Sequence, residues 1–449
     1  MRILGIRKGL VLGVIAQFLQ YGAALLLLPL IVTYLSPEQV GVWYVFIAVQ
    51  GLAMLMDFGF QPSFARSFAL AFSGSQELAR EGLAAARGEA ANYALAGKVL
   101  LAAKVIYAGA SLIALALLLS LGTLYIGSVG TLTQGEVTDA WVIFSFAVSV
   151  NLYLMWISPL LIGADKVDRN YLYLIVNRGT FFLLGAILLI QGYGLSGLSA
   201  AFLLAPLVAR VAVSGSLNPL LFDIRRAGEP NFSAARTVLT TIWHNSKKMG
   251  VVSLGAYLIT RYNIFVVSTF VGLSAAASYG ITIQILMAVH LVSQLAFQIS
   301  LPAMIRARVE HDIGQLRKLF SAASLFYFLI FIFMAASVFF FGNWLFSSVG
   351  GGAGLVEDTV LAMLIGIFLL EGNHANSALV ITTGNKVPFV VPAILSGIAI
   401  VFLSTLAGYL GAGLIAIVLI QGLVQLSYNN WKWPKMIYEE LYKRPDLKV

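Results

Sequence analysis

The chain has 449 residues, of which 60% are hydrophobic and only 10% are charged, and its mean hydropathy is +0.91. A soluble domain of this length could not bury so large an apolar fraction, so the composition excludes a soluble globular protein and predicts a polytopic membrane protein. The net charge is +9, and the absence of cysteine excludes disulfides and thiolate metal sites.

Twelve apolar segments are each long enough to cross a bilayer as a helix, which predicts an all-α fold. A hydrocarbon core about 30 Å thick requires about 20 helical residues. The predicted spans, in chain order, are residues 9–35, 38–64, 99–125, 137–162, 170–190, 194–219, 249–271, 277–302, 319–345, 357–382, 387–408 and 412–431.

Basic residues occur in alternate connections between these spans. Of the 28 Lys and Arg residues, four lie inside spans, and the remaining 24 lie at the termini and in every second connection. The intervening connections, such as residues 127–139 and 342–358, contain no Lys or Arg. Because these residues accumulate on the cytoplasmic side, both termini are predicted to be cytoplasmic. This topology accounts for the net charge, so we expect no nucleic-acid partner.

The two halves of the sequence resemble each other when one is shifted by about 240 residues. The shift aligns Arg7-Lys8 with Lys247-Lys248, Pro62 with Pro302 and Arg66 with Arg306, and it leaves Gly41 and Gly280 one residue out of register. It predicts two six-helix lobes, residues 1–219 and 249–431, related by a pseudo-two-fold axis along the membrane normal. Residues 220–248 would be a cytoplasmic linker and residues 432–449 a cytoplasmic tail. Hydropathy alone could produce part of this match.

Four basic residues lie inside the predicted spans: Lys104, Arg178, Arg210 and Arg261. A cation in hydrocarbon usually has an anionic partner, but Asp57 and Glu371 are the only acidic residues in comparable positions. Lys104 is close enough to the membrane edge to extend its amine to the interface. The other three cations lie deeper. This excess of positive charge indicates an anionic substrate.

Arg261 lies near the middle of the seventh span, within the polar run Thr260-Arg261-Tyr262-Asn263. Polar residues on more than one face do not suit a helix that faces lipid. Arg261 and Asn263 are therefore candidates to line a water-filled cavity that binds substrate, with Arg178 and Arg210 as further contacts. The alternative is a structural ion pair between Arg261 and Glu371.

Four residues are candidates for coupling or gating: Glu371, His374, His290 and Asp57. Glu371 and His374 belong to a polar cluster in the tenth span, where Glu371 could bind a coupling proton or Na⁺ or neutralise an arginine. His290, midway along the eighth span, could change charge near neutral pH or serve as a hydrogen-bonded packing residue. Asp57 could pair with Arg66 or cap a broken helix.

The sequence contains no Gly-rich phosphate loop, metal-ligand spacing or nucleophile motif, so it predicts neither an enzyme nor a metal site.

The stretch YLSPEQVGVWY, residues 34–44, followed by Asp57-Phe58-Gly59-Phe60 and Arg66, resembles the first two helices of polysaccharide flippases of the multidrug/oligosaccharidyl-lipid/polysaccharide (MOP) superfamily. Twelve spans in two halves and a basic linker extend the resemblance to the whole chain. It implies a MATE-like fold. It also implies a flippase that moves an undecaprenyl-pyrophosphate-linked oligosaccharide, an O-antigen or exopolysaccharide repeat unit, from the cytoplasmic to the periplasmic leaflet of the bacterial inner membrane by alternating access. Twelve rather than fourteen spans argues against the related lipid II flippases.

This substrate agrees with the charges inside the spans, because a pyrophosphate crossing a low-dielectric layer needs fixed positive charge along its route. We expect Arg66 and Arg306 to attract it at the inner mouth. No cofactor is expected, and the coupling ion would be H⁺ or Na⁺. Expected partners are membrane lipids and the polysaccharide polymerase and chain-length machinery.

Three alternatives remain open. A MATE-type drug or cation exporter of the same superfamily should present acidic residues to its cargo. A membrane glycosyltransferase, polymerase or ligase acting on lipid-linked glycans should carry a large outer loop with basic and catalytic groups. A scaffold without a passage should hold its buried arginines in closed salt bridges.

Overall fold

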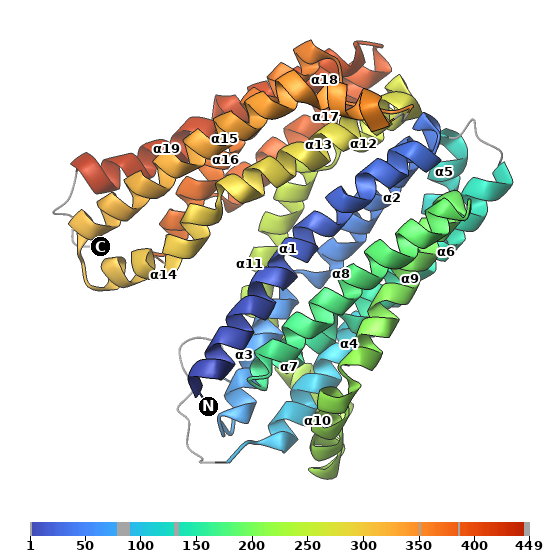
Figure 1. The fold of residues 1–449 in the computed structure, drawn as a ribbon. Coiled ribbons are helices and arrows are strands. Elements are labelled where there is room, and N and C mark those ends of the chain that lie inside the picture. The colour runs from blue at the N-terminus through green and yellow to red at the C-terminus, as the bar shows by residue number, and fades with distance from the viewer. Residues whose placement is uncertain (1, 79–89, 130–133, 350–351, 385–386, 444–449) are drawn as a thin grey trace. The chain divides into compact units, whose positions relative to one another are not determined.

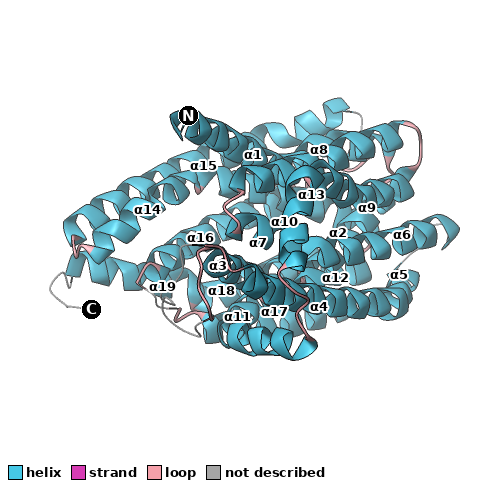
Figure 2. Ribbon diagram, turned by 90° about the horizontal axis from the view of Figure 1, so that it is seen from below, coloured by secondary structure: helices cyan, strands magenta, loops and turns pink. Residues whose placement is uncertain are grey.

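The computed structural model describes residues 2–78, 90–129, 134–349, 352–384 and 387–443 (Figure 1). Within these ranges all regular secondary structure is helical (Figure 2), as the sequence predicts. Twelve helical segments are long and apolar enough to cross a membrane, which is the predicted number. The chain is therefore a multi-pass membrane protein. The cytoplasmic placement of the termini stays a prediction, and some of the basic residues that support it lie outside the described ranges: Arg80, Arg87, Lys386, Arg444 and Lys448.

Packing divides the chain into two compact units. Unit 1 comprises Met1–Leu35 and Val49–Ser253, and unit 2 comprises Ser36–Ala48 and Leu254–Val449. The first part of α2 (Pro37–Met54) thus packs with unit 2, and the first part of α11 (Phe232–Thr260) packs with unit 1. The two lobes predicted from chain order do not include this exchange of helix segments between the units. The two-fold axis predicted to relate the lobes stays a prediction. The predicted linker, residues 220–248, is largely helical.

Unit 1 begins with α1 (Arg2–Tyr34), the end of α2 with the 3-10 helix η1 (Leu55–Asp57), and α3 (Phe60–Phe72). Two composite helices follow: α4 (Tyr93–Leu117) is continued by the π-helix η2 (Leu118–Gly122) and α5 (Thr123–Val129), and α6 (Gln134–Tyr153) is continued by the 3-10 helix η3 (Leu154–Trp156) and α7 (Ile157–Gly163). The unit ends with α8 (Val167–Ile190), α9 (Gly194–Ala212), α10 (Ser214–Arg226) and the start of α11. Unit 2 contains the start of α2, the end of α11, α12 (Asn263–Val266) continued by the π-helix η4 (Val267–Val271), α13 (Leu273–Ser293), α14 (Leu295–Val309), α15 (Ile313–Val349), α16 (Asp358–Thr382), α17 (Val390–Tyr409), α18 (Gly413–Ser427), α19 (Asn429–Tyr438) and the π-helix η5 (Glu439–Lys443).

Four predicted spans extend too far at their C-terminal ends. The second is interrupted where Phe58 (φ 45°) and Gly59 (φ 72°) take the left-handed conformation before α3. The sixth ends at Ala212, the eighth at Ser293 and the twelfth at Ser427, and in each case a separate short helix begins two residues later. Hydropathy missed these breaks because the short helices are themselves partly apolar.

Two breaks recur at corresponding places in the two halves of the chain, although the break between α11 and α12 has no counterpart in the continuous α1. α2 is followed by the short α3, and α13 by the short α14. Likewise α9 is followed by α10, and α18 by α19. This correspondence depends on backbone breaks rather than hydropathy, and the six-helix repeat itself stays a prediction.

A close helix contact in unit 2 depends on the two glycines that the repeat aligns approximately. A Cβ atom on Gly41 of α2 would overlap the carbonyl oxygen of Leu273, and one on Gly280 of α13 would overlap the ring of Tyr44. Small residues of this kind let helices in lipid approach closely. The contact therefore holds the first part of α2 against α13.

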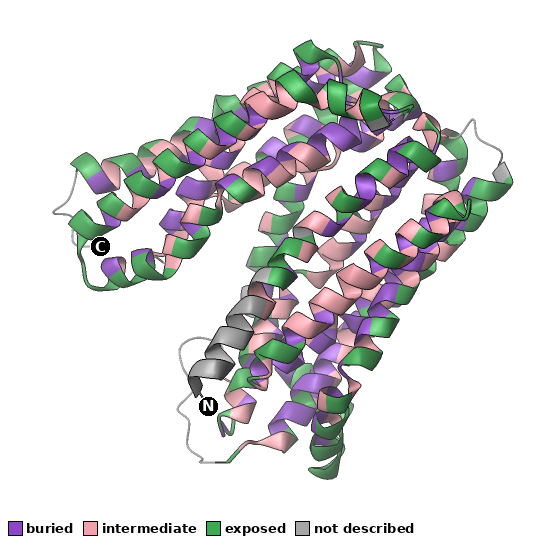
Figure 3. Ribbon diagram, in the orientation of Figure 1, coloured by how far each residue is buried: buried purple, intermediate pink, exposed green. Residues whose placement is uncertain are grey.

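Burial is uneven among the spans of unit 2. In the most apolar stretch of α13, half of the residues are buried. In the most apolar stretch of residues 313–348, which belong to α15, only 17% are buried. Figure 3 shows the same contrast, with α15 mainly green and pink. An apolar helix with so little protein cover is suited to lipid contact.

Candidate functional site

Arg261 lies at a break in the seventh span. α11 ends at Thr260 and α12 begins at Asn263, so the polar run in the sequence coincides with an interruption of the helix. The Arg261 side chain is partly buried and lines a cavity of about 20 Å³ together with residues of α2 and α13, including Tyr44 and Tyr279. This space holds about one water molecule. Within unit 2 considered alone, the predicted water-filled cavity is therefore small.

No described carboxylate forms an ion pair with Arg261. Its Nη2 donates to the Sδ of Met287 at 3.1 Å, and a thioether is a weak acceptor. Glu371 instead accepts a hydrogen bond from Gln421 at 3.2 Å. The ion pair between Arg261 and Glu371, which the sequence left open, is thus absent from the described residues. A guanidinium group has five N–H donors, so most of the donor capacity of Arg261 remains for water or a ligand.

A hydrogen-bonded chain leads from this break to Glu371. The Nδ2 of Asn263 in α12 donates to the Oε1 of Gln421 in α18 at 3.0 Å, and the Nε2 of Gln421 donates to the Oε1 of Glu371 in α16. Asn263 and Gln421 are both buried. The structure therefore connects a predicted substrate residue with the predicted coupling residue. Sequence reasoning missed Gln421, although a glutamine in a membrane span is itself a signal of an internal role.

Two histidines lie near Glu371: His290 of α13 packs against α16, and His374 belongs to α16 itself. His290 Nδ1 is 3.5 Å from the hydroxyl of Tyr327, and His374 Nδ1 is 2.8 Å from the Oδ1 of Asn430. A Cβ atom on Gly372 would overlap the Tyr327 hydroxyl and lie 2.7 Å from His290 Nδ1. Glycine at this position therefore lets the side chains of α13 and α15 reach α16.

The described residues include no group of three or more His, Cys, Asp or Glu side chains placed to hold a metal ion.

Asp57 lies in unit 1 at the break between α2 and α3. Its Oδ1 accepts a hydrogen bond from the backbone N–H of Gln61 at 3.2 Å and another from the hydroxyl of Tyr107 at 2.6 Å. The first bond satisfies one of the backbone N–H groups that the start of α3 leaves unpaired. Asp57 thus caps the interrupted helix. A gating role for it stays a prediction.

Cations of three helices share one region of unit 1. Arg210 in α9 donates to the Oδ1 of Asn218 at 3.1 Å, and the amine of Lys104 in α4 lies 4.9 Å from the ring centroid of Trp156. Neither cation forms an ion pair with a described carboxylate, and their charges repel each other. Arg178 in α8 and Arg210 both interact electrostatically with the same tyrosine, Tyr173. The structure therefore brings together residues that the sequence placed in separate spans.

Arg66 and Arg306 occupy corresponding positions in the two halves of the chain. Arg66 lies on α3 of unit 1, and Arg306 lies on α14 of unit 2. Both residues are exposed. Their predicted role, attracting substrate at the inner mouth, stays a prediction.

Comparisons with solved structures identify the fold of the chain. No protein-family model matches the chain, and no curated protein does. A multidrug resistance MATE family transporter of the MOP superfamily, in an inward-facing conformation, matches with a TM-score of 0.67 at 15% identity over 97% of this chain and 99% of its own. The lipid II flippase MurJ, in an inward closed conformation, matches with a TM-score of 0.67 at 13% identity over 96% of this chain and 87% of its own. A MATE in the straight conformation matches with a TM-score of 0.56 at 16% identity over 98% of this chain and 96% of its own. The chain therefore has the fold of MATE transporters and MurJ, as expected.

Proposed function

We propose that the chain is a flippase of the MOP superfamily. Its cargo is an undecaprenyl-pyrophosphate-linked oligosaccharide, an O-antigen or exopolysaccharide repeat unit. The cargo moves from the cytoplasmic to the periplasmic leaflet of the bacterial inner membrane by alternating access. The observation that carries this proposal is Arg261, a guanidinium inside a membrane span with no described carboxylate partner. The fold, shared with transporters and a flippase, supports a transport function.

In the proposed mechanism, Arg261 donates hydrogen bonds to the pyrophosphate oxygens once the cargo has left the aqueous phase. Charge-assisted hydrogen bonds from a guanidinium are strong and suit phosphate geometry. They offset part of the cost of moving the anionic head group into a medium of low dielectric. Arg178 and Arg210 add positive potential in unit 1, and Arg66 and Arg306 attract the cargo from the cytoplasm. A polysaccharide polymerase and its chain-length machinery would act on the delivered unit.

A MATE-type exporter of cationic drugs is the competing function, and two of the three structural matches above favour it. Such an exporter needs acidic groups that face its cargo. The two acidic residues at depth in the spans already make other contacts, because Asp57 caps α3 and Glu371 accepts a hydrogen bond from Gln421. The sign of the remaining charge favours anionic cargo.

Flux measurements in proteoliposomes distinguish the two functions. We expect a fluorescent polyprenyl-pyrophosphate oligosaccharide to cross the bilayer at least about tenfold faster with the protein than in protein-free vesicles, a difference of about 1.4 kcal/mol in activation free energy. A cationic dye should cross at the same rate in both. Transport of the dye without movement of the lipid would overturn the proposal in favour of the exporter.

We further propose that Glu371 binds the coupling ion, H⁺ or Na⁺. Glutamine at this position can still accept the hydrogen bond from Gln421 but cannot ionise, so Glu371→Gln should keep the fold and lose the response to an ion gradient. The measurement is lipid flux under imposed proton and sodium gradients. The control is Glu357→Gln, which changes an exposed carboxylate directly before α16 and should respond as the wild type does. A normal gradient response in Glu371→Gln would exclude this role.

A further inference from the structure

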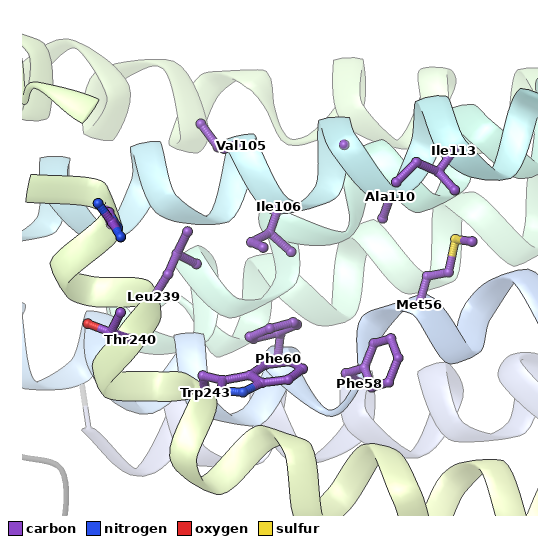
Figure 4. Close-up of a pocket in the computed structure, with 12 residues that line it drawn as sticks. Met56, Phe58, Phe60, Val105, Ile106, Ala110, Ile113, Leu239, Thr240 and Trp243 are labelled. Carbon is purple, nitrogen blue, oxygen red and sulfur yellow. The ribbon is translucent and has the colours of Figure 1, made fainter. Parts of the chain in front are cut away.

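A larger cavity lies entirely within unit 1. It is an open groove of about 510 Å³ between the η1–α3 segment, α4 and the start of α11 (Figure 4). The aromatic side chains of Phe58, Phe60 and Trp243 form part of its wall, and aliphatic side chains of α4 form another part. Figure 4 shows that the cavity is elongated, with Leu239 and Thr240 at one end and Met56 and Ile113 at the other. None of the candidate substrate or coupling residues lines it.

The polar lining of this cavity is concentrated on α11. Arg236 and Thr240 both line it, and they lie one helical turn apart on the same face of the helix. Arg236 is exposed, and it forms no ion pair or hydrogen bond with a described residue. The cavity therefore combines a long apolar wall with a single cation available at its polar end.

Small residues on α4 keep the cavity open, and its rim is exposed. A Cβ atom on Gly109 would meet nothing within 4 Å, and Ala110 lies beside it in the lining. Phe58 is 42% exposed and Trp243 is 45% exposed, with ring centroids 6.0 Å apart. Exposed aromatic rings beside a cation at the end of a membrane span are typical of contact with lipid at the interface.

We propose that this groove binds one acyl chain of an anionic phospholipid from the surrounding bilayer. The lipid phosphate lies at Arg236 and Thr240, and the chain runs along the wall from Trp243 toward Ile113. Basic pockets next to membrane helices recognise anionic lipid head groups in this way. The single cation matches the single phosphate group of a phospholipid, whereas a pyrophosphate has two phosphate groups. The site lies in unit 1 and does not depend on the proposed flippase cargo.

Lipid retention by the purified full chain tests the proposal. Native mass spectrometry and thermal unfolding in detergent would compare phosphatidylglycerol with phosphatidylcholine of the same chains. We expect phosphatidylglycerol to be retained and to raise the unfolding midpoint by about 2–4 °C more than phosphatidylcholine does. Arg236→Gln should abolish this preference. Gly109→Leu should fill the groove and abolish retention of both lipids, while leucine suits the helix better than glycine does.

Two matched variants control for charge and for fold. Arg226→Gln removes an exposed cation at the end of α10, and Gly127→Leu adds the same side chain to α5 at a position with no atom within 4 Å. Both should retain phosphatidylglycerol as the wild type does. Equal retention of the two phospholipids by the wild type, or unchanged retention in Gly109→Leu, would overturn the proposal. The wild type could instead retain a polyprenyl pyrophosphate in preference to phosphatidylglycerol. If Gly109→Leu abolished that retention, the groove would be a site for the cargo, and the proposal would also be overturned.

Discussion

Replacing Arg261 with methionine is expected to lower transport of a lipid-linked pyrophosphate oligosaccharide by about 10- to 100-fold. Hydrogen bonds to a charged group contribute about 1.5–3 kcal/mol, and 1.4 kcal/mol corresponds to a factor of ten. The guanidinium now donates to Met287 alone among the described residues, so its loss leaves no buried carboxylate unpaired. The protein should therefore stay folded while cargo binding fails. The measurement is the initial rate of lipid translocation in proteoliposomes at matched protein content.

Two further variants separate charge from geometry in this experiment. Arg261→Lys keeps the charge but removes the planar fork, so we expect an intermediate rate. Arg226→Met removes a cation from the exposed end of α10 and should transport as the wild type does. A wild-type rate in Arg261→Met would show that this residue does not contact the cargo.

Alanine at Gly372 is expected to destabilise the protein by about 1–3 kcal/mol, the usual cost of overpacking a tight site. The new methyl group would overlap the hydroxyl of Tyr327 and crowd Nδ1 of His290, so α13 and α15 would have to move away from α16. The change also separates the histidine from Glu371, which lies next to the substitution. The measurement is the unfolding midpoint in detergent, followed by gradient-driven lipid flux.

Gly366→Ala is the matched control for this substitution. Gly366 lies on the same helix, and a Cβ atom there would meet nothing within 4 Å. Alanine at this position should be neutral or stabilising, because it suits a helix better than glycine by about 1 kcal/mol. If both variants unfold at the same midpoint, the packing assigned to Gly372 is wrong.

The number of spans could be predicted from the sequence because hydropathy reports directly on the apolar length of each helix. The interruptions at Phe58-Gly59, Val213 and Gln294 could not be predicted in the same way. Each depends on the backbone conformation of one or two residues inside a continuous apolar pattern. The packing of the first part of α2 with unit 2 involves close contacts at Gly41 and Gly280, which only tertiary packing reveals.

The candidate site was predictable where several polar residues occur together. The run around Arg261 and Asn263 marked a real break in the helix, and the cluster that begins at Glu371 marked a real concentration of polar contacts. Gln421 and Tyr327 were missed because neither belongs to a run of consecutive polar residues. The sequence also left open whether Arg261 pairs with Glu371, since depth along two helices does not determine which of their faces meet.

Binding of the cargo head group to the folded protein tests the central role of Arg261 most directly. Isothermal titration calorimetry in detergent would compare a short-chain prenyl-pyrophosphate oligosaccharide with the same glycolipid lacking phosphate, for the wild type and for Arg261→Met. We predict saturable binding that requires the pyrophosphate and that weakens about tenfold or more in Arg261→Met. Equal affinities of the wild type for the two lipids, or of the two proteins for the pyrophosphate lipid, would contradict this account.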